Sequence, residues 1–303
     1  MNQSILEFIK NTVSEQNVLL KEPMSRHTTF RTGGEATAFV QVPSKEALEQ
    51  LILYFAKVSQ EYFVLGKGSN LLVGDKGYQG VVLHIGSGMS DIRMMGDQML
   101  VEAGASLPQV AKTAAENGLS GLEFAAGIPG SIGGAVVMNA GAYDGEMKQV
   151  VKSVTVLNQQ GEVMELDNDT MEFGYRQSII KNRPFVVTQV LLQLTKGNPE
   201  EIKAKGDAFN ARRREKQPLE YPSAGSSFKR PEGYFAGKLI MDAGLRGFRI
   251  GGAQIAEKHC GFVVNVGNAT SADVRDVMQE AQERVKNQFG VELEPEIVFL
   301  GDF

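Results

Sequence analysis

The most informative stretch of this sequence, residues 124–143, reads FAAGIPGSIGGAVVMNAGAY. It runs for twenty residues without a charge, the length of a membrane span, but contains five glycines and a proline. A helix with so many breakers would leave backbone polar groups unpaired in lipid. We therefore interpret the stretch as a buried glycine-rich loop that leads into a short element of a soluble protein.

A second glycine-rich loop lies upstream, where residues 65–71 read LGKGSNL after an apolar segment. The G-x-G-x-x pattern ends in Leu71, where a dinucleotide fingerprint needs glycine, and Leu71–Gly74 resembles another strand rather than a helix. Taken alone, this loop is more simply a tight turn between strands. Two such loops in one chain can direct several backbone N–H groups at one anion, which favours a diphosphate ligand.

The composition excludes several classes of protein. Hydrophobic residues make up 42% and charged residues 22% of the 303 residues, an ordinary globular mixture. The net charge of −5 argues against nucleic acid as the main partner. A single cysteine cannot form an internal disulfide, and the three histidines are far apart, so we expect no metal site. P-loop and G-x-S-x-G motifs are absent.

Apolar periodicity and capping residues predict the secondary structure. Helices are expected at residues 4–14, after Ser44, from Ser106 to Gly118 with a capping box to Gln109, from Pro199, and at 271–289. Strands are expected at residues 36–42, 80–85, 98–103, 151–157, 185–194 and 296–300. This α+β order lacks strict βαβ alternation, and a polar, helical segment after Lys196 indicates a domain boundary there.

Three further residues stand in suggestive contexts. Arg176 lies in an otherwise weakly charged FGYRQS segment, and Ser226 lies in a loop of small residues followed by two cations. Each could instead be an ordinary surface or loop residue. The acids at 292, 294 and 296 would share one face of a strand, and Glu296 is placed at the edge of a core because Val298 and Leu300 continue that face.

Taken together and in this order, these motifs resemble the UDP-N-acetylenolpyruvoylglucosamine reductase family. The resemblance extends from residue 28 to residue 301. It rests on GKGSN (66–70), GIPGSIGGAVVMNAGAY (127–143), GYRQS (174–178), AGSSFKRP (224–231), GGAQIAEKHCGFVVN (251–265) and EPEIVF (294–299).

The resemblance implies an α+β fold of the vanillyl-alcohol-oxidase or PCMH type, in which two subdomains hold FAD and a substrate-binding domain follows. The implied segments are an N-terminal helical segment (1–23), a FAD-binding domain (24–196, divided near 85) and a C-terminal substrate-binding domain (197–303). FAD is expected to be noncovalent and held by main-chain groups, without a metal. The residues implied are Gly66, Lys67, Gly68, Ser69, Asn70, Leu71, Gly127, Ile128, Pro129, Gly130, Ser131, Gly133, Gly134, Asn139, Ala140 and Gly141.

The implied activity is an NADPH-dependent reduction of UDP-N-acetylglucosamine enolpyruvate to UDP-N-acetylmuramate. This step belongs to bacterial peptidoglycan synthesis, and so to cell-wall biogenesis, cell shape, cell division and the cell cycle. The substrate receives a hydride from the flavin at its methylene carbon, and negative charge develops on the neighbouring carbon. Arg176 with Glu296 is expected to stabilise that charge, and Ser226 to donate the proton. Substrate contacts are expected from Tyr175, Lys216, Arg230 and His259.

The stretch between Arg176 and Ser226 is too short for the extra, tyrosine-bearing segment of the longer form of the family. We expect a cytoplasmic enzyme without nucleic-acid, membrane or obligate protein partners. One alternative is an FAD-dependent oxidase of alcohols or sugars on the same fold, although neither loop contains a His or Cys for covalent flavin attachment. Another is a non-enzymatic sensor of nucleotide sugars.

Overall fold

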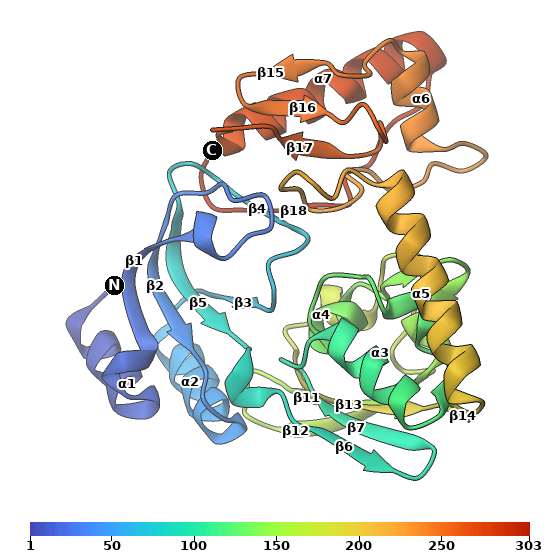
Figure 1. Cartoon of the computed structure of the whole chain (residues 1–303). Coiled ribbons are helices and arrows are strands. Elements are labelled where there is room, and N and C mark those ends of the chain that lie inside the picture. The colour runs from blue at the N-terminus through green and yellow to red at the C-terminus, as the bar shows by residue number, and fades with distance from the viewer. The chain divides into compact units, whose positions relative to one another are not determined.

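The computed structural model describes all residues, 1–303, and shows a chain that folds into two compact units (Figure 1). Unit 1 consists of residues 1–20, 38–67 and 80–213, and unit 2 of residues 21–37, 68–79 and 214–303. Both units are therefore built from segments that are discontinuous in sequence. The predicted domain limits at residues 23 and 196 separate a FAD-binding part from a substrate-binding part. They remain a prediction.

Most of a four-stranded sheet lies in unit 1, with the strand order β1-β2-β5-β3. Its strands are β1 (Val18–Pro23), β2 (Glu35–Gln41), β3 (Tyr62–Leu65) and β5 (Tyr78–His84). Helices α1 (Gln3–Val13) and α2 (Lys45–Val58) lie side by side beneath it (Figure 1), and the Phe8 and Tyr54 rings stack at 3.8 Å. The predicted Ser44 cap is confirmed, because its hydroxyl accepts a hydrogen bond from the Ala47 N–H at 3.3 Å.

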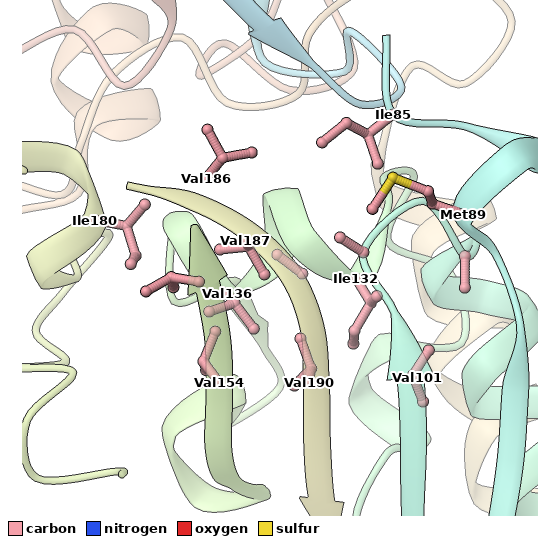
Figure 2. Close-up of a cluster of buried hydrophobic side chains, with 14 of the residues drawn as sticks. Ile85, Met89, Val101, Ile132, Val136, Val154, Ile180, Val186, Val187 and Val190 are labelled. Atoms are coloured by element: carbon pink, nitrogen blue, oxygen red, sulfur yellow. The ribbon is translucent and has the colours of Figure 1, made fainter. Parts of the chain in front are cut away.

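A five-stranded antiparallel sheet forms the other half of unit 1, with the order β12-β11-β13-β7-β6. The strands are β6 (Ile92–Met95), β7 (Gln98–Glu102), β11 (Val151–Leu157), β12 (Val163–Asp167) and β13 (Val186–Gln193). Helices α3 (Leu107–Glu116) and α4 (Ile132–Val137) cover one face of it (Figure 1). In Figure 2, Ile132 and Val136 of α4 point at Val101, Val154 and Val190 of the sheet.

This packing explains the charge-free stretch at 124–143. Ile132 and Val136 are completely buried, so the short helix is held by its apolar side rather than by its length. The predicted short element is confirmed as α4, but the prediction that the glycine-rich loop before it is buried is wrong: residues 126–128 and 130 are half-buried and Pro129 is exposed, because only the helix that follows packs its apolar side against the sheet. The remaining elements of unit 1 are β8 (Leu119–Ser120), β9 (Gly141–Ala142), β10 (Gly145–Glu146), β14 (Thr195–Lys196) and most of α5 (Pro199–Lys216).

Unit 2 is built on a three-stranded antiparallel sheet with the order β15-β16-β17, against which α7 packs. Its elements are β15 (Arg249–Ile250), β16 (Ala253–Ile255), β17 (Val263–Asn265), α6 (Ala236–Asp242), α7 (Ser271–Phe289), β4 (Leu71–Val73) and β18 (Val298–Leu300). Strands β4 and β18 pair in parallel, and Phe30 and Leu72 are fully buried in the core of this unit. The inserted segments 21–37 and 68–79 are therefore integral to unit 2.

Two local predictions are wrong. Ser106 precedes α3 but its hydroxyl caps nothing, because the backbone around it pairs with residues 130–132 instead. The acids at 292, 294 and 296 do not share a strand face, because the strand begins only at Val298. No helix combines the length and the apolar character that a membrane crossing requires.

Candidate active site

The two glycine-rich loops meet at Gly66 and Ser131 in unit 1. A Cβ atom built on Gly66 would lie 2.3 Å from the Ser131 hydroxyl oxygen, a distance that no side chain can tolerate. Glycine permits this approach between the end of β3 and the start of α4 without displacing the Ser131 hydroxyl, which caps α4. The structure thus brings together two of the segments that the sequence pattern assigned to one diphosphate. The geometry alone does not identify the bound group.

Internal hydrogen bonds already occupy part of the 127–134 loop. The N–H groups of Ile132 and Gly133 donate to the carbonyls of Ala105 (2.8 Å) and Ala103 (2.9 Å), and Gly134 donates to the Ser131 hydroxyl (3.3 Å). Because these donors are engaged, they are poorly placed to hold a phosphate as well. The N–H groups of Gly127, Gly130 and Ser131 make no such bond, so they are the main-chain donors of this loop that a ligand could use.

The second half of the first loop, Gly68–Leu71, lies in unit 2. Gly68 has φ +60°, and a Cβ there would lie 1.9 Å from the His27 carbonyl oxygen. The side-chain amide of Asn70 donates to the Glu296 carbonyl (2.9 Å), and the Asn70 carbonyl accepts from the Val298 N–H (3.0 Å). This loop is therefore fixed to the segment that carries Glu296.

Arg176 lies in a closed turn in unit 1. Gly174 and Gln177 exchange backbone hydrogen bonds of 3.0 and 3.2 Å, and Arg176 between them has φ +54°. Its guanidinium donates to the Gly141 carbonyl (3.1 Å) and lies 5.2 Å from the centroid of the Tyr175 ring. A left-handed conformation is uncommon for arginine, and here the surrounding contacts hold it in place.

Ser226 and Glu296 are neighbours in unit 2. Ser226 forms an isolated β-bridge with Phe262, and the Glu296 N–H donates to the carbonyl of the adjacent Ser227 at 2.9 Å. Ser227 is fully buried, and its hydroxyl accepts from the Val263 N–H at 3.0 Å. Ser226 and Glu296 themselves are half-buried, so both side chains are accessible to a ligand while their backbone is hydrogen-bonded.

The remaining predicted substrate residues differ in character. Lys216 is exposed at the end of α5, and the exposed Arg230 guanidinium lies 3.9 Å from the Phe235 ring centroid. Burial lowers the pKa of His259, and a backbone hydrogen bond only partly opposes this effect. His259 is therefore neutral near pH 7, and its Nδ1 accepts from the Gly261 N–H at 3.1 Å. It can offer a phosphate a hydrogen bond but no charge.

The units divide the predicted site residues between them. Unit 1 holds Gly66, Lys67, Gly127, Ile128, Pro129, Gly130, Ser131, Gly133, Gly134, Asn139, Ala140, Gly141, Tyr175 and Arg176. Unit 2 holds Gly68, Ser69, Asn70, Leu71, Lys216, Ser226, Arg230, His259 and Glu296. No group of three or more His, Cys, Asp and Glu side chains is arranged to hold a metal ion.

Sequence reasoning missed one cation beside the second glycine-rich loop. A Cβ on Gly127 would lie 2.2 Å from the Asn210 side-chain oxygen and 2.8 Å from Cδ of Arg213. Burial lowers the pKa of Arg213, although the guanidinium stays charged at neutral pH. Arg213 is one of three consecutive arginines in a polar helix, so only the tertiary contact distinguishes it from its exposed neighbours.

Comparison with known proteins is consistent with this arrangement. The family model described as the C-terminal domain of UDP-N-acetylenolpyruvoylglucosamine reductase matches residues 217–300, and one described as a FAD binding domain matches residues 36–167. The reductase of Caldanaerobacter subterraneus subsp. tengcongensis is 48% identical over 302 residues, with all of both chains covered. The reductase of Agathobacter rectalis is 49% identical over 315 residues, again with complete coverage.

Solved structures agree on the fold. The reductase from Thermus caldophilus aligns with a TM-score of 0.81 at 36% identity, over 94% of this chain and 98% of that one. A 4-ethylphenol oxidase from Gulosibacter chungangensis aligns with a TM-score of 0.50 at 17% identity, over 64% of this chain and 42% of that one. This likeness shows a shared fold alone. The predicted two-subdomain FAD-binding fold with a C-terminal domain is confirmed. The chain belongs to the UDP-N-acetylenolpyruvoylglucosamine reductase family.

Proposed function

We propose that this chain reduces UDP-N-acetylglucosamine enolpyruvate to UDP-N-acetylmuramate, with NADPH as the source of electrons. Family membership makes the protein an FAD-dependent oxidoreductase. The observation that carries the assignment of substrate is the match to curated reductases along the entire chain, rather than along the flavin domain alone. We further propose a cytoplasmic role in making cell-wall precursors, and hence in cell shape and division.

The residues present fit FAD. The approach of Gly66 to Ser131, which any Cβ would obstruct, allows main-chain atoms of two loops to face one ligand. A pyrophosphate suits N–H donors of this kind and needs no lysine or metal. When bound, FAD supplies the hydride that the enolpyruvyl carbon accepts. We propose noncovalent binding, since neither loop contains a His or Cys.

The protein side chains would then manage charge and protons. We propose that Arg176 binds the substrate carboxylate, into which negative charge spreads after hydride addition, and that Glu296 acts around the same group. We propose that the Ser226 hydroxyl donates the proton to the carbanionic carbon. The rigid backbone beneath Ser226 and Glu296, with the 2.9 Å bond from Glu296 to Ser227, supports a shared role on one ligand.

Ser226→Ala tests the proton-donor role. The variant should retain its flavin and be reduced by NADPH at the wild-type rate, while reoxidation by the enolpyruvyl substrate slows by ~10²–10⁴-fold or more. Stopped-flow absorbance measures the two half-reactions separately. Acid precipitation of the same samples should release the flavin into the supernatant, as noncovalent binding requires.

Ser223→Ala is the matched control, since it removes a half-buried hydroxyl from the same loop. It should leave both half-reactions unchanged. Normal reoxidation in Ser226→Ala would eliminate the proton-donor role, and a wild-type protein that the enolpyruvyl substrate cannot reoxidise would overturn the proposed activity itself.

A further inference from the structure

Asn139 is a fully buried polar residue whose side-chain amide is bonded entirely within the protein. Its Nδ2 donates to the Gly174 carbonyl (2.9 Å) and to Oε2 of Glu146 (3.1 Å), and its Oδ1 accepts from the Lys148 N–H (2.9 Å). Both amide N–H groups are therefore engaged, and the side chain has no donor left for a cofactor. Any contact of residue 139 with FAD would therefore come from its main chain, as the family resemblance implies, and the side chain has a separate role.

One of these contacts, together with one made by Gly141, reaches the turn that carries Arg176. Gly174 is the first residue of the closed Gly174–Gln177 turn, and its carbonyl receives the Asn139 amide. Two residues after Asn139, the Gly141 carbonyl accepts the Arg176 guanidinium at 3.1 Å. The segment 139–141 thus contacts the turn at two points, the backbone of Gly174 and the guanidinium of Arg176.

Backbone geometry agrees with a fixed arrangement. Asn139 has φ +40° and Arg176 has φ +54°, both in the left-handed region. Asparagine tolerates this region better than most residues, whereas for arginine it costs on the order of 1 kcal/mol or more. The hydrogen bonds from the 139–141 segment oppose relaxation of the turn to an ordinary conformation.

We propose that Asn139 is a positioning residue that orients the guanidinium of Arg176 toward the substrate carboxylate. The proposal rests on the function proposed above for Arg176. Asn139 would touch neither substrate nor flavin through its side chain. Its effect would pass through the Gly174–Gln177 turn, so it should alter the half-reaction that uses Arg176 and spare the other.

Asn139→Asp is the sharpest variant, because it changes the volume little and replaces the donating NH₂ group by an acceptor. A carboxylate there would face the Glu146 carboxylate and the Gly174 carbonyl, so both contacts would turn repulsive. In the holoenzyme we expect reoxidation by the enolpyruvyl substrate to slow by roughly 10–100-fold, as a misplacement of about 1 Å can cause. Flavin content and the rate of reduction by NADPH should stay within about twofold of the wild-type values, a change much smaller than the expected slowing of reoxidation.

The double variant Asn139→Asp/Arg176→Ala separates positioning from general structural damage. If Asn139 acts through Arg176, adding Asn139→Asp to Arg176→Ala should slow reoxidation little further. The same factor in both backgrounds, or equal slowing of both half-reactions, would overturn the proposal. Unchanged reoxidation in Arg176→Ala alone would instead refute the function proposed for Arg176.

A milder variant keeps the proposal testable if Asn139→Asp does not fold. Asn139→Ser shortens the side chain away from Gly174 without adding charge, and should show the same selective loss in milder form. Glu146→Gln added to Asn139→Asp should restore part of the rate, because the glutamine amide can donate to the new carboxylate. If neither Asn139→Asp nor Asn139→Ser yields holoenzyme, the residue is structural and the proposal is wrong.

Discussion

A single methyl group at residue 66 would collide with the next glycine-rich loop. The ideal Cβ position lies 2.3 Å from the Ser131 hydroxyl oxygen and 3.3 Å from its Cβ. Relief requires the Ser131 hydroxyl to turn away from the Gly134 N–H that it caps, or the chain around residue 66 to shift, because backbone bonds tie the loop 130–132 to residues 105–107. Either change disturbs the place where the two loops meet.

Gly66→Ala should consequently lower the flavin occupancy of purified protein, measured as the ratio of flavin to protein absorbance. Ser131→Ala removes the nearer oxygen, so the double variant Gly66→Ala/Ser131→Ala should recover occupancy relative to Gly66→Ala. Ser131→Ala alone provides the baseline. Full occupancy in Gly66→Ala would show that the approach of these loops does not matter for the cofactor.

Asn139 and His259 show what a residue's surroundings add to its type. The sequence marked both as possible ligand contacts. The structure shows an asparagine whose donors are spent on Gly174 and Glu146, and a histidine that burial keeps neutral. Both outcomes depend on atoms brought from distant parts of the chain, which no local pattern reports.

At the scale of elements, α7 has capping residues at both of its ends, and these define where the helix begins and stops. Thr270 and Asp273 form a reciprocal capping box, and Gly290 closes the helix at φ +69°. Burial tends to raise the pKa of Asp273, but hydrogen bonds from the Thr270 and Gly252 N–H groups and the Thr270 hydroxyl outweigh it and lower the pKa. A depressed carboxyl pKa stabilises the fold above the unfolded-state pKa of ~3.9 and loses that contribution as pH falls through the folded-state value.

Asp273→Asn should therefore reduce the free energy of unfolding by about 1 kcal/mol at pH 7, as loss of a helix cap typically does. The difference from wild type should shrink below about pH 4, where the wild-type carboxyl itself protonates. Urea denaturation at several pH values measures both effects. Asp276→Asn is the control on the same helix, since Asp276 pairs only with the adjacent Arg275 at a half-exposed site.

Helix α2, for which the sequence predicted the Ser44 cap, and α7, which was predicted from its apolar period, form where the patterns placed them. The expected capping box at Ser106 failed because the neighbouring backbone is committed to a bridge with the loop at residue 131. The bridge uses the Leu107 N–H and the Ala105 carbonyl, so a tertiary contact and not the local capping pattern sets the backbone at this helix start. The strands β15, β16 and β17 have only two or three residues each, too few to show a period, so the sequence pattern did not predict the sheet of unit 2.

At the scale of the whole molecule, the chain cannot be cut once into two folding parts. Unit 2 needs Leu71–Val73 to pair with β18, and it buries Phe30 and Leu72 in its core. Asp75 accepts hydrogen bonds from the Ser271 and Ala272 N–H groups at the start of α7 (2.8 and 2.9 Å). Phe30, Leu71–Val73 and Asp75 all precede the last segment of the unit, residues 214–303, by more than a hundred positions.

Residues 197–303 expressed alone should therefore fail to fold, although the C-terminal family model spans most of them. We expect a broad, non-cooperative urea transition by circular dichroism and poorly dispersed amide resonances. The control is a chain that joins 21–37, 68–79 and 214–303 through flexible linkers, which should regain cooperativity. A sharp transition in the 197–303 fragment would show that unit 2 folds without residues 21–37 and 68–79.

By itself, the sequence determined the family, the FAD-binding fold, the two glycine-rich loops and the capped helices. These follow from motifs and apolar periods that span a few residues. Within such a short stretch, the residue types themselves set the backbone freedom and the face that is buried. Only the tertiary structure decided that Gly66 meets Ser131, that Asn139 holds the turn of Arg176, and that unit 2 incorporates residues 21–37 and 68–79. The physical reason is that a hydrogen-bond partner or a buried contact far along the chain leaves no trace in local spacing.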